Sequence, residues 1–312
     1  MARYLVTGGA GFIGSNIAEA LVKRGEEVVI LDNLSTGYEK NIAHIKNDIS
    51  FIRGDIRDAE TVRTALTGVD CVLHEAALAS VPRSIEDPAL ITDVNVRGTL
   101  VMLEEARLAR VKRFVYAASS SAYGDSETLP KVEHMVPKPL SPYAASKLTG
   151  EYYCSVYAHV YGLSTLSLRY FNIFGPRQDP KSQYAAVIPI FISHLLAGKQ
   201  PTIFGDGEQS RDFTYVENVV NANIRASLCE RARGETVNIA CGTRYTLNEL
   251  FARMKKTIGC SIDPRYASPR VGDVKHSQAD ISAAQKLIGY SIAVSFEEGL
   301  RRTIDWYRGV AA

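Results

Sequence analysis

The sequence predicts an α/β protein with a doubly wound parallel sheet, followed by a smaller C-terminal α/β domain. Three observations predict it. Short apolar runs alternate with helical patterns along the first half of the chain, a glycine-rich turn joins the first run to the first helix, and polar motifs stand where the runs end. Because ligands bind at the carboxyl ends of parallel strands, those polar motifs are the candidate functional residues.

The first thirty residues read as strand, glycine turn, helix and strand. Arg3–Thr7 is an apolar run, and Gly8, Gly11 and Gly14 follow it with the spacing G-x-x-G-x-x-G. Such glycines permit a tight turn, close approach of a pyrophosphate and close helix packing, while the helix N-terminus offers amide donors to phosphate. This pattern predicts a Rossmann-type dinucleotide site.

An acidic residue ends the second predicted strand, Val28–Leu31. Asp32 at this place is expected to accept hydrogen bonds from the adenosine ribose and to repel a 2′-phosphate, which favours NAD over NADP. A turn or cap aspartate is the ordinary alternative. The other predicted cofactor contacts are Phe12, Ile13, Asn33, Thr36, Gly37, Asp55, Ile56, Ala76, Ala77, Asn95, Ala117 and Tyr170.

Strand and helix patterns continue to alternate after Asp32. We predict strands at Ser50–Ile56, Asp70–His74 and Lys112–Ser119, and a sixth that ends at Phe171-Asn172. His74 is expected to be a packed residue at a strand end and not a ligand.

Tyr143 and Lys147 form the strongest candidate for catalysis. Ser141 is a predicted helix N-cap and Pro142 the first helical residue, which places Tyr143 and Lys147 one turn apart on one face. A phenol has a pKa near 10, and a neighbouring ammonium lowers it, so we expect Tyr143 to act as a general base. The simple alternative is an ordinary amphipathic helix start.

Composition excludes several classes of function. Thirty-six basic and 34 acidic residues give a net charge of +2, which offers no electrostatic footprint for nucleic acid. The length suggests about two domains. No signal peptide or membrane span is evident, so we expect a cytoplasmic protein. The cysteines lack metal spacing and are expected to be free thiols: Cys71, Cys154, Cys229, Cys241 and Cys260.

Taken together, Thr7–Gly14, the serines Ser119–Ser121 and the Tyr143/Lys147 pair resemble the extended short-chain dehydrogenase/reductase superfamily. More narrowly, the chain is similar to nucleotide-sugar epimerases typified by UDP-glucose 4-epimerase. Three later segments carry the same resemblance, and in that family they bind the sugar and the UDP: Leu168–Arg177, Gly205–Phe213 and Arg270–Asp273.

The resemblance implies bound NAD and transient oxidation of the sugar. Tyr143 would take the proton of the 4-hydroxyl while C4 gives a hydride to NAD, and the 4-keto intermediate would turn before the hydride returns to its opposite face. Lys147 would hold the nicotinamide ribose, and Ser119 would bond the 4-oxygen. The implied substrate contacts are Ser80, Ser119, Ser120, Ser121, Tyr143, Asn172, Ala186, Val187, Thr202, Phe204, Arg211, Arg270, Asp273 and Ser277.

Ser277 bears on the choice of sugar. In the UDP-galactose epimerases this position often carries a tyrosine that closes the sugar pocket. A serine leaves room for a 2-acetamido group. We therefore expect the enzyme to accept UDP-GlcNAc and UDP-GalNAc as well as UDP-Glc and UDP-Gal.

The resemblance also implies a division of the chain and a homodimer. Residues 1–172 would form the NAD-binding domain, with a segment at about 213–241 returning to it, and residues 173–312 would bind the UDP-sugar. Helices near 95–110 and 145–161 would form the dimer contact. Four side chains would lie partly in that contact, although core packing explains them equally: Tyr152, Tyr153, Val156 and Tyr157.

Three alternatives stay open. A UDP-glucuronate 4-epimerase would need an extra positive charge in the sugar pocket, for which Arg83 is the candidate. A nucleotide-sugar 4,6-dehydratase would carry an Asp-Glu pair at the two positions where this chain has Ser120 and Ser121. This chain therefore lacks the carboxylates that the elimination of water needs. A non-catalytic NAD-binding protein could dispense with the tyrosine base, which this chain keeps.

Overall fold

The computed structural model describes residues 1–180, 186–269 and 275–311. Seven parallel strands form the main sheet in the order β11-β6-β5-β4-β1-β2-β3, which confirms the predicted doubly wound sheet. The strand order reverses between β1 and β4. The strands are β1 (Arg3–Thr7), β2 (Glu27–Asp32), β3 (Ile49–Arg53), β4 (Cys71–His74), β5 (Arg113–Ser119), β6 (Thr165–Tyr170) and β11 (Glu235–Ile239).

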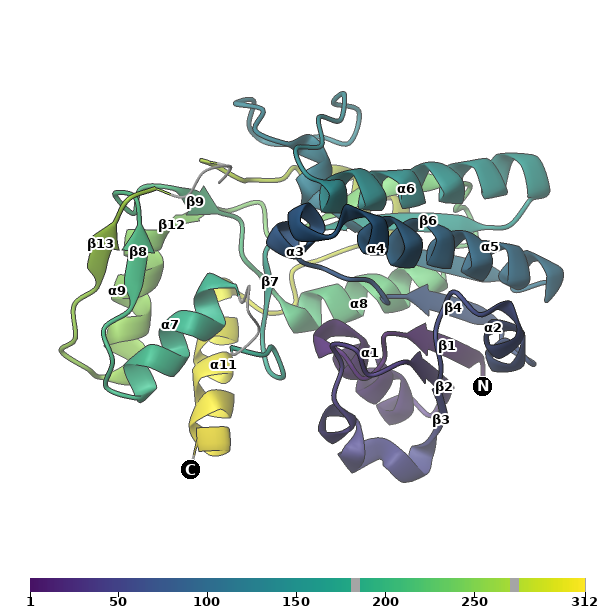
Figure 1. The fold of residues 1–312 in the computed structure, drawn as a ribbon, viewed down its shortest axis with the longest axis horizontal. Coiled ribbons are helices and arrows are strands. Elements are labelled where there is room, and N and C mark those ends of the chain that lie inside the picture. The colour runs from purple at the N-terminus through teal and green to yellow at the C-terminus, as the bar shows by residue number, and fades with distance from the viewer. Residues whose placement is uncertain (181–185, 270–274, 312) are drawn as a thin grey trace.

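Helices cover both faces of this sheet, and a separate apolar core fills the space on each side (Figure 1). One face packs against α1 (Phe12–Lys23), α8 (Val216–Ser227) and α10 (Ser282–Ile288). The other packs against α2 (Ala59–Ala65), α5 (Gly98–Leu108) and α6 (Pro142–Tyr161). Because both faces are buried, the strands read as nearly continuous apolar runs in the sequence.

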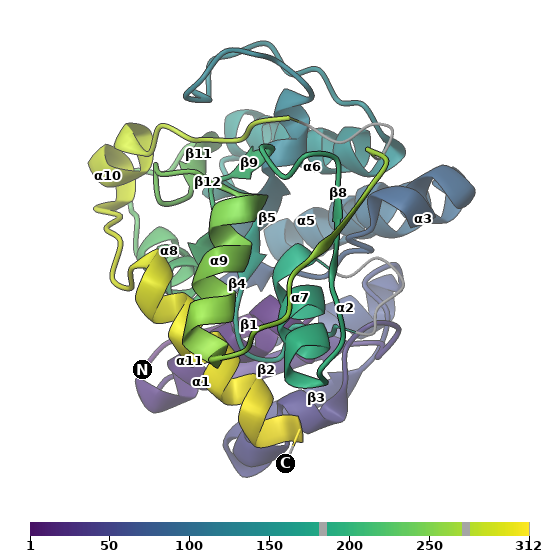
Figure 2. The same ribbon diagram turned by 90° about the vertical axis from the view of Figure 1, so that its left-hand side faces the viewer.

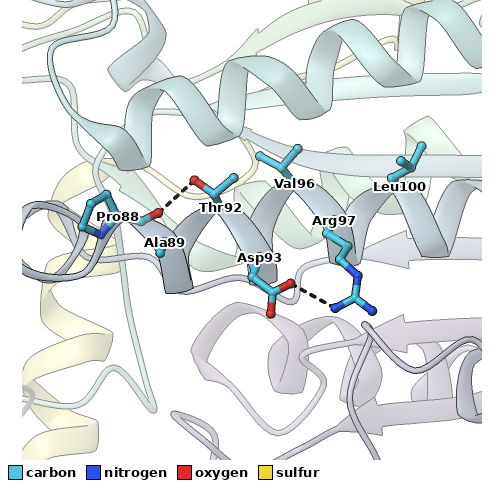
Figure 3. A pocket seen from close by; sticks show the side chains of 7 residues that line it. All are labelled: Pro88, Ala89, Thr92, Asp93, Val96, Arg97 and Leu100. Atoms are coloured by element: carbon cyan, nitrogen blue, oxygen red, sulfur yellow. Dashed lines mark hydrogen bonds and ion pairs between the residues drawn. The ribbon is translucent and has the colours of Figure 1, made fainter.

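Short elements connect the main ones, and they include the helical segment ahead of α5. Figure 3 shows a shallow groove on its outer surface, lined by residues from Pro88 to Leu100, where Arg97 pairs with Asp93 at 3.0 Å. The connecting elements are η1 (Glu39–Asn41), η2 (Ala43–Asp48), α3 (Val81–Glu86), α4 (Pro88–Thr92), the π-helical η3 (Asp93–Arg97) and η4 (Ser120–Tyr123).

The C-terminal part lies beside the carboxyl ends of the main strands, with α7, α9 and α11 packed on a third apolar core (Figures 1 and 2). It holds three two-stranded sheets, β10 with β7, β12 with β9 and β13 with β8. Its elements are β7 (Ile173–Phe174), α7 (Val187–Leu196), β8 (Thr202–Phe204), β9 (Ser210–Arg211), β10 (Thr214–Tyr215), β12 (Tyr245–Thr246), α9 (Leu247–Ile258), β13 (Arg265–Ala267) and α11 (Phe296–Ala311).

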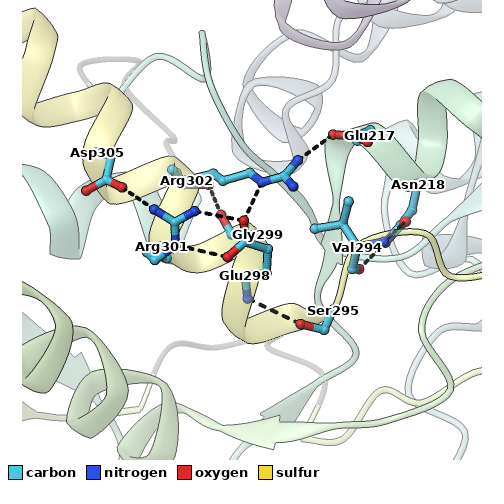
Figure 4. A network of polar contacts seen from close by, with 10 residues as sticks. Glu217, Asn218, Val294, Ser295, Glu298, Gly299, Arg301, Arg302 and Asp305 are labelled. Atoms are coloured by element: carbon cyan, nitrogen blue, oxygen red, sulfur yellow. Dashed lines mark hydrogen bonds and ion pairs between the residues drawn. The ribbon is translucent and has the colours of Figure 1, made fainter.

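The closing helix α11 is attached to α8 of the main sheet (Figure 4). Asn218 on α8 accepts the amides of Ala293 and Val294 at 2.9 and 3.0 Å and donates to the Val294 carbonyl at 2.8 Å. Arg302 on α11 pairs with Glu217 at 2.9 Å, an exposed ion pair that contributes little. The buried asparagine is therefore the firmer of the two links.

Several sequence expectations can be compared with the structure directly. The predicted cap is confirmed, because the Ser141 hydroxyl accepts the amide of Ala144 at 3.1 Å with Pro142 at the first helical position. The sixth strand was predicted two residues too long. It ends at Tyr170, since Asn172 has a left-handed backbone with φ of 40°.

The thiols are free, as expected, at all five cysteines. No helix within the described residues is long and apolar enough to cross a bilayer. The same residues contain no group of three or more His, Cys, Asp and Glu side chains that could hold a metal ion.

Gly150 lets α6 lie close to β5. A Cβ at Gly150 would overlap the hydroxyl of Tyr116 and lie 2.8 Å from its Cε1 atom. Tyr116 is 1% exposed and donates to the Lys147 carbonyl at 3.3 Å, so its ring has no room to withdraw. The close approach of α6 to the sheet thus depends on this glycine.

We expect Gly150→Ala to lower the free energy of unfolding by about 1–3 kcal/mol, because the added methyl overpacks a buried site. Gly309→Ala in α11 is the matched control, since a Cβ there has no described atom within 4 Å. That control should be neutral or stabilising by up to about 1 kcal/mol. Chemical denaturation of both variants measures the difference, and equal stability of the two would contradict the packing argument.

Candidate active site

A cavity of about 600 Å³ lies over the carboxyl ends of β1, β2 and β4. The sequence-predicted cofactor residues that line it are Gly8, Gly11, Phe12, Ile13, Gly14, Asp32, Asn33, Thr36, Asp55, Ile56, Ala76 and Ala77. Their positions fit the rule that ligands bind where the strand order of an open parallel sheet reverses.

The glycine turn is built as a phosphate site requires. Gly8 has φ of 66°, and a Cβ on Gly14 would overlap the Gly8 carbonyl oxygen and lie 2.8 Å from the carbonyl carbon. No described side chain caps the start of α1, where Gly11 is the N-cap. The first amides of α1 are thus left for a ligand, and with the helix dipole they favour an anion such as a pyrophosphate.

Asp32 lines this cavity with its carboxylate already oriented. One oxygen accepts the amide of Ala10 at 2.9 Å and the other that of Leu34 at 2.8 Å. Each oxygen keeps a lone pair for a ribose hydroxyl. Burial raises the pKa of Asp32, and the two amides work against that rise.

Asp55 forms the far corner of the same cavity. Its carboxylate accepts from Asn33 at 2.9 Å and from Arg57, which also pairs with Asp93 at 2.6 Å. The bonds to Arg57 hold the pKa of Asp55 well below its usual range. Asp55 is therefore a fixed acceptor in the wall of this cavity.

A chain of hydrogen bonds passes through His74, and each bond runs from donor to acceptor in the same direction. This chain holds the cavity wall at the ends of β1 and β4. Thr99 donates to the Asn95 carbonyl at 2.6 Å, so its oxygen accepts from His74 Nε2 at 3.0 Å. His74 Nδ1 then accepts from the Thr7 hydroxyl at 2.7 Å, and Thr7 accepts the amide of Ala76 at 3.2 Å. His74 is neutral in this chain, and burial lowers its pKa to about 3. It is a packing residue, as expected.

Ser119, Tyr143 and Lys147 are brought together at the end of β5 and the start of α6. Lys147 donates from Nζ to the Ala117 carbonyl at 2.8 Å and lies 5.0 Å from the centroid of the Tyr116 ring. Tyr143 lies near enough to Ser119 for that hydroxyl to lower the pKa of the phenol, and the Ser119 hydroxyl accepts from the Ser121 hydroxyl at 2.9 Å. A substrate oxygen placed there would meet two hydroxyls and a nearby cation.

The sequence predicts that the Lys147 ammonium lowers the pKa of Tyr143, and this prediction is wrong for the chain as it stands. The pKa of Tyr143 is raised, because burial disfavours the phenolate and the Ser119 hydroxyl only partly offsets that effect. Lys147 donates a hydrogen bond to the Ala117 carbonyl, and burial lowers the pKa of Lys147 itself while Glu75 raises it. The Glu75 carboxylate is thus a counter-charge for the ammonium.

Within the part of the chain that the structure describes, several predicted cofactor residues lie outside the lining of this cavity. Asn95 is buried, its amide is hydrogen-bonded to the Leu78 backbone and the Ser146 hydroxyl, and its contact with the cofactor stays a prediction. Gly37 packs against Ala10 and Asp32. The others outside the lining are Ala117, Tyr143, Lys147 and Tyr170.

A second cavity of about 610 Å³ lies in the C-terminal part. Asn172 enters it at the point where the chain leaves β6, with its amide donating to the Asp212 carbonyl at 3.1 Å. Ala186 belongs to the walls of both cavities. The predicted substrate residues in this wall are Asn172, Ala186, Val187, Thr202, Phe204 and Arg211.

The other predicted substrate residues lie elsewhere. Ser80 lines the first cavity and caps α3 by accepting the amide of Arg83 at 3.2 Å. Ser120 and Ser121 form the start of η4 beside Ser119. Ser277 bonds the Ser210 carbonyl at 3.0 Å and is in neither lining, while Arg270 and Asp273 lie outside the described residues.

Sequence reasoning missed five polar residues of the first cavity: Ser35, Glu75, Glu86, Gln178 and Asp179. Gln178 and Asp179 reach it from the loop after β7, and Tyr38 donates to Asp179 at 2.8 Å. Nothing in the local pattern distinguishes these two from other loop residues. Glu75 is different, because it directly follows β4 and its position at a strand end could have marked it.

Comparison with known proteins agrees with this geometry. Residues 4–240 match the NAD dependent epimerase/dehydratase family. The chain is 38% identical to the UDP-glucose 4-epimerase of Mycolicibacterium smegmatis, over 98% of each chain.

Two solved structures superpose on nearly the whole chain, each with a TM-score of 0.95. One is a UDP-N-acetylglucosamine 4-epimerase from Methanobrevibacter ruminantium in complex with UDP-N-acetylmuramic acid, 40% identical over 99% of both chains. The other is a UDP-glucose 4-epimerase from Thermotoga maritima with UDP-glucose, 38% identical over 99% of this chain and 100% of that one.

Proposed function

Because the chain belongs to the NAD-dependent epimerase/dehydratase family, we propose that it is a UDP-sugar 4-epimerase that inverts C4 through a transient 4-keto sugar. The observation that carries the proposal is the grouping of Ser119, Tyr143 and Lys147 beside a cavity built for a dinucleotide. The main sheet, residues 1–172 with about 213–241, would hold NAD, and residues 173–312 would hold the UDP-sugar.

Each residue of the group has a distinct task. Tyr143 takes the proton of the sugar 4-hydroxyl and later returns it, and Ser119 donates to the developing carbonyl oxygen. Lys147 holds the cofactor ribose and stabilises the phenolate. Bound NAD supplies a hydride acceptor that can give the hydride back. Gly8–Gly14 and Asp32 would hold its pyrophosphate and ribose.

The chemistry of β5 separates this reaction from an elimination. A 4,6-dehydratase needs carboxylates after the strand-five hydroxyl to remove water from C6. Here Ser121 donates its hydroxyl to Ser119, and Ser120 takes the other position. Neither serine can act as a general acid or base near neutral pH, which favours epimerisation.

We expect Tyr143→Phe to lower kcat for 4-epimerisation by about 10²–10⁴-fold, because the base is lost. Binding of NAD should change little. Tyr161→Phe, an exposed tyrosine on the same helix, is the matched control and should keep full activity. Product analysis by NMR after incubation with UDP-Glc, UDP-GlcNAc and UDP-GlcA, run separately, measures the rates.

The same assay tests the alternatives. Turnover of UDP-GlcA alone would favour a uronate 4-epimerase, for which Arg83 in the cavity wall is the candidate contact. Full activity of the Tyr143 variant would overturn the assignment of the base. Bound NAD with no 4-epimer from any of the three sugars would point to a non-catalytic protein.

We further propose that the enzyme accepts UDP-GlcNAc and UDP-GalNAc as well as UDP-Glc and UDP-Gal. The support is Ser277, which is small where related UDP-galactose epimerases often carry a tyrosine. Ser277 lies outside the linings of both described cavities, so the support is the type of residue: a serine leaves volume for a 2-acetamido group where a tyrosine ring would exclude that group by direct overlap.

Replacing the serine should therefore separate the two sugar types. We expect Ser277→Tyr to lower kcat/KM for UDP-GlcNAc by about 100-fold and that for UDP-Glc by less than about threefold. Ser277→Ala, which stays small, is the control and should keep both activities. If the tyrosine variant processes UDP-GlcNAc as well as the parent protein, Ser277 does not set the sugar preference.

We also propose a homodimer formed through α5 and α6. Tyr152, Val156 and Val160 repeat every four residues along α6 and are 56%, 47% and 66% exposed. Such an apolar stripe on one helix face favours burial against a partner. Tyr157, by contrast, is buried and donates to Glu104 at 3.1 Å, so it belongs to the core of the protomer.

We expect the purified chain to sediment at twice its mass and Val156→Glu to sediment at the mass of one chain, because a buried carboxylate without a partner opposes association. Ile292→Glu, an exposed apolar residue away from both helices, should leave the mass unchanged. A parent protein that sediments as one chain at micromolar concentration would contradict the dimer.

A further inference from the structure

Glu75 is an acidic side chain in the wall of the cofactor cavity that the proposed reaction does not use. It directly follows β4, and in the register of the sheet His74 lies opposite Tyr116. The next residues in each strand, Glu75 and Ala117, therefore stand at the same level. The Ala117 carbonyl accepts a hydrogen bond from the Lys147 ammonium. Glu75, which directly follows the neighbouring strand β4, therefore lies next to the catalytic group.

A dedicated donor chain holds the Glu75 carboxylate. Asn223 on α8 donates to the Val219 carbonyl at 2.9 Å, which fixes the orientation of its amide, and the same nitrogen donates to the Tyr170 hydroxyl at 2.7 Å. With its oxygen so occupied, Tyr170 donates its own proton to Glu75 at 2.8 Å. The bonds from Asn223 to Tyr170 and from Tyr170 to Glu75 run toward the carboxylate, which partly offsets the rise in the pKa of Glu75 that burial causes.

Glu75 and Lys147 approach the site from opposite faces of the sheet. Tyr170 belongs to the core shared with α1 and α8, whereas Lys147 comes from α6 on the other face. Burial raises the pKa of Glu75, while Tyr170 and the Lys147 ammonium lower it. The carboxyl ends of β4 and β5 are thus flanked by one anion and one cation.

This pair lies in the nicotinamide half of the cavity. Asp32 and Asp55 mark the adenine end at β2 and β3, and the glycine turn at β1 marks the pyrophosphate. The sheet order then places β4 and β5 under the remaining half. The nicotinamide ring of NAD⁺ carries a positive charge and that of NADH does not, so a fixed charge in this half distinguishes the two forms.

We infer that Glu75, positioned by Tyr170 and Asn223, determines the oxidation state of the cofactor that the protein prefers, by favouring NAD⁺ over NADH. Without Glu75 the cleft would present the Lys147 ammonium alone to a cationic ring. The inference rests on the cofactor of the proposed function. It gives that function a resting state, because an epimerase must start each cycle with the oxidised form.

The test compares the dissociation constants of NAD⁺ and NADH for cofactor-free protein at about pH 8, where the carboxylate is ionised. Calorimetry and thermal unfolding in the presence of each dinucleotide give the two constants. We expect Glu75→Gln to shift their ratio about tenfold toward NADH, because the isosteric amide removes only the charge. Tyr170→Phe keeps the charge and loses the donor, so it should shift the ratio in the same direction by about threefold.

Glu60→Gln is the matched control, since it removes one negative charge from an exposed position on α2. Its ratio should equal that of the parent protein. A shift in the control, or equal loss of both affinities in Glu75→Gln, would overturn the inference, as would an unchanged ratio in a folded Glu75→Gln protein. The binding measurement contains no UDP-sugar, so its result does not depend on whether the protein catalyses the proposed epimerisation.

Discussion

The hydrogen bond from Lys147 to the Ala117 carbonyl is the contact on which the rest of the site depends. It places a buried ammonium between α6 and the end of β5, and so fixes the rotation of α6 about its own axis. Tyr143, one turn earlier, is then held against Ser119 at the end of the same strand. Gly150 makes the arrangement sterically feasible, because α6 can approach the Tyr116 ring only where no Cβ intervenes.

Hydrogen bonds of fixed direction also hold the wall of the first cavity. The chain from Ala76 through Thr7, His74 and Thr99 has one consistent direction from donor to acceptor, and it joins β1, β4 and the helical segment before α5. Buried polar groups in such a chain are costly to leave unpaired, so each one fixes its neighbours. Neutral His74 therefore secures the backbone on which a dinucleotide would rest, without touching it.

Local signals in the sequence were sufficient for the fold and for much of the cofactor wall. The glycine spacing, the acid after the second strand and the Ser141-Pro142 cap each have a local physical cause, and the structure shows the corresponding turn, carboxylate and helix start. Tertiary effects were harder to predict. The raised pKa of Tyr143 depends on burial, and Asn95 faces Leu78 and Ser146 only after α6 has packed beside it.

The second cavity was the least predictable from local patterns, because its residues come from separated segments of the chain. Thr202, for example, reaches its cavity only through the pairing of β8 with β13, and its hydroxyl accepts from Arg265 at 2.6 Å. Glu75 shows the opposite case, a strand-end residue whose partners Tyr170 and Asn223 are remote in sequence. Its position could be predicted, but its role could not.

The single methyl group of Ala186 is part of the wall of both cavities. A larger side chain at this position would narrow both compartments together. Change at this residue therefore cannot adjust the fit of one ligand without altering the fit of the other. The residues that line only the second cavity can change its shape without altering the first.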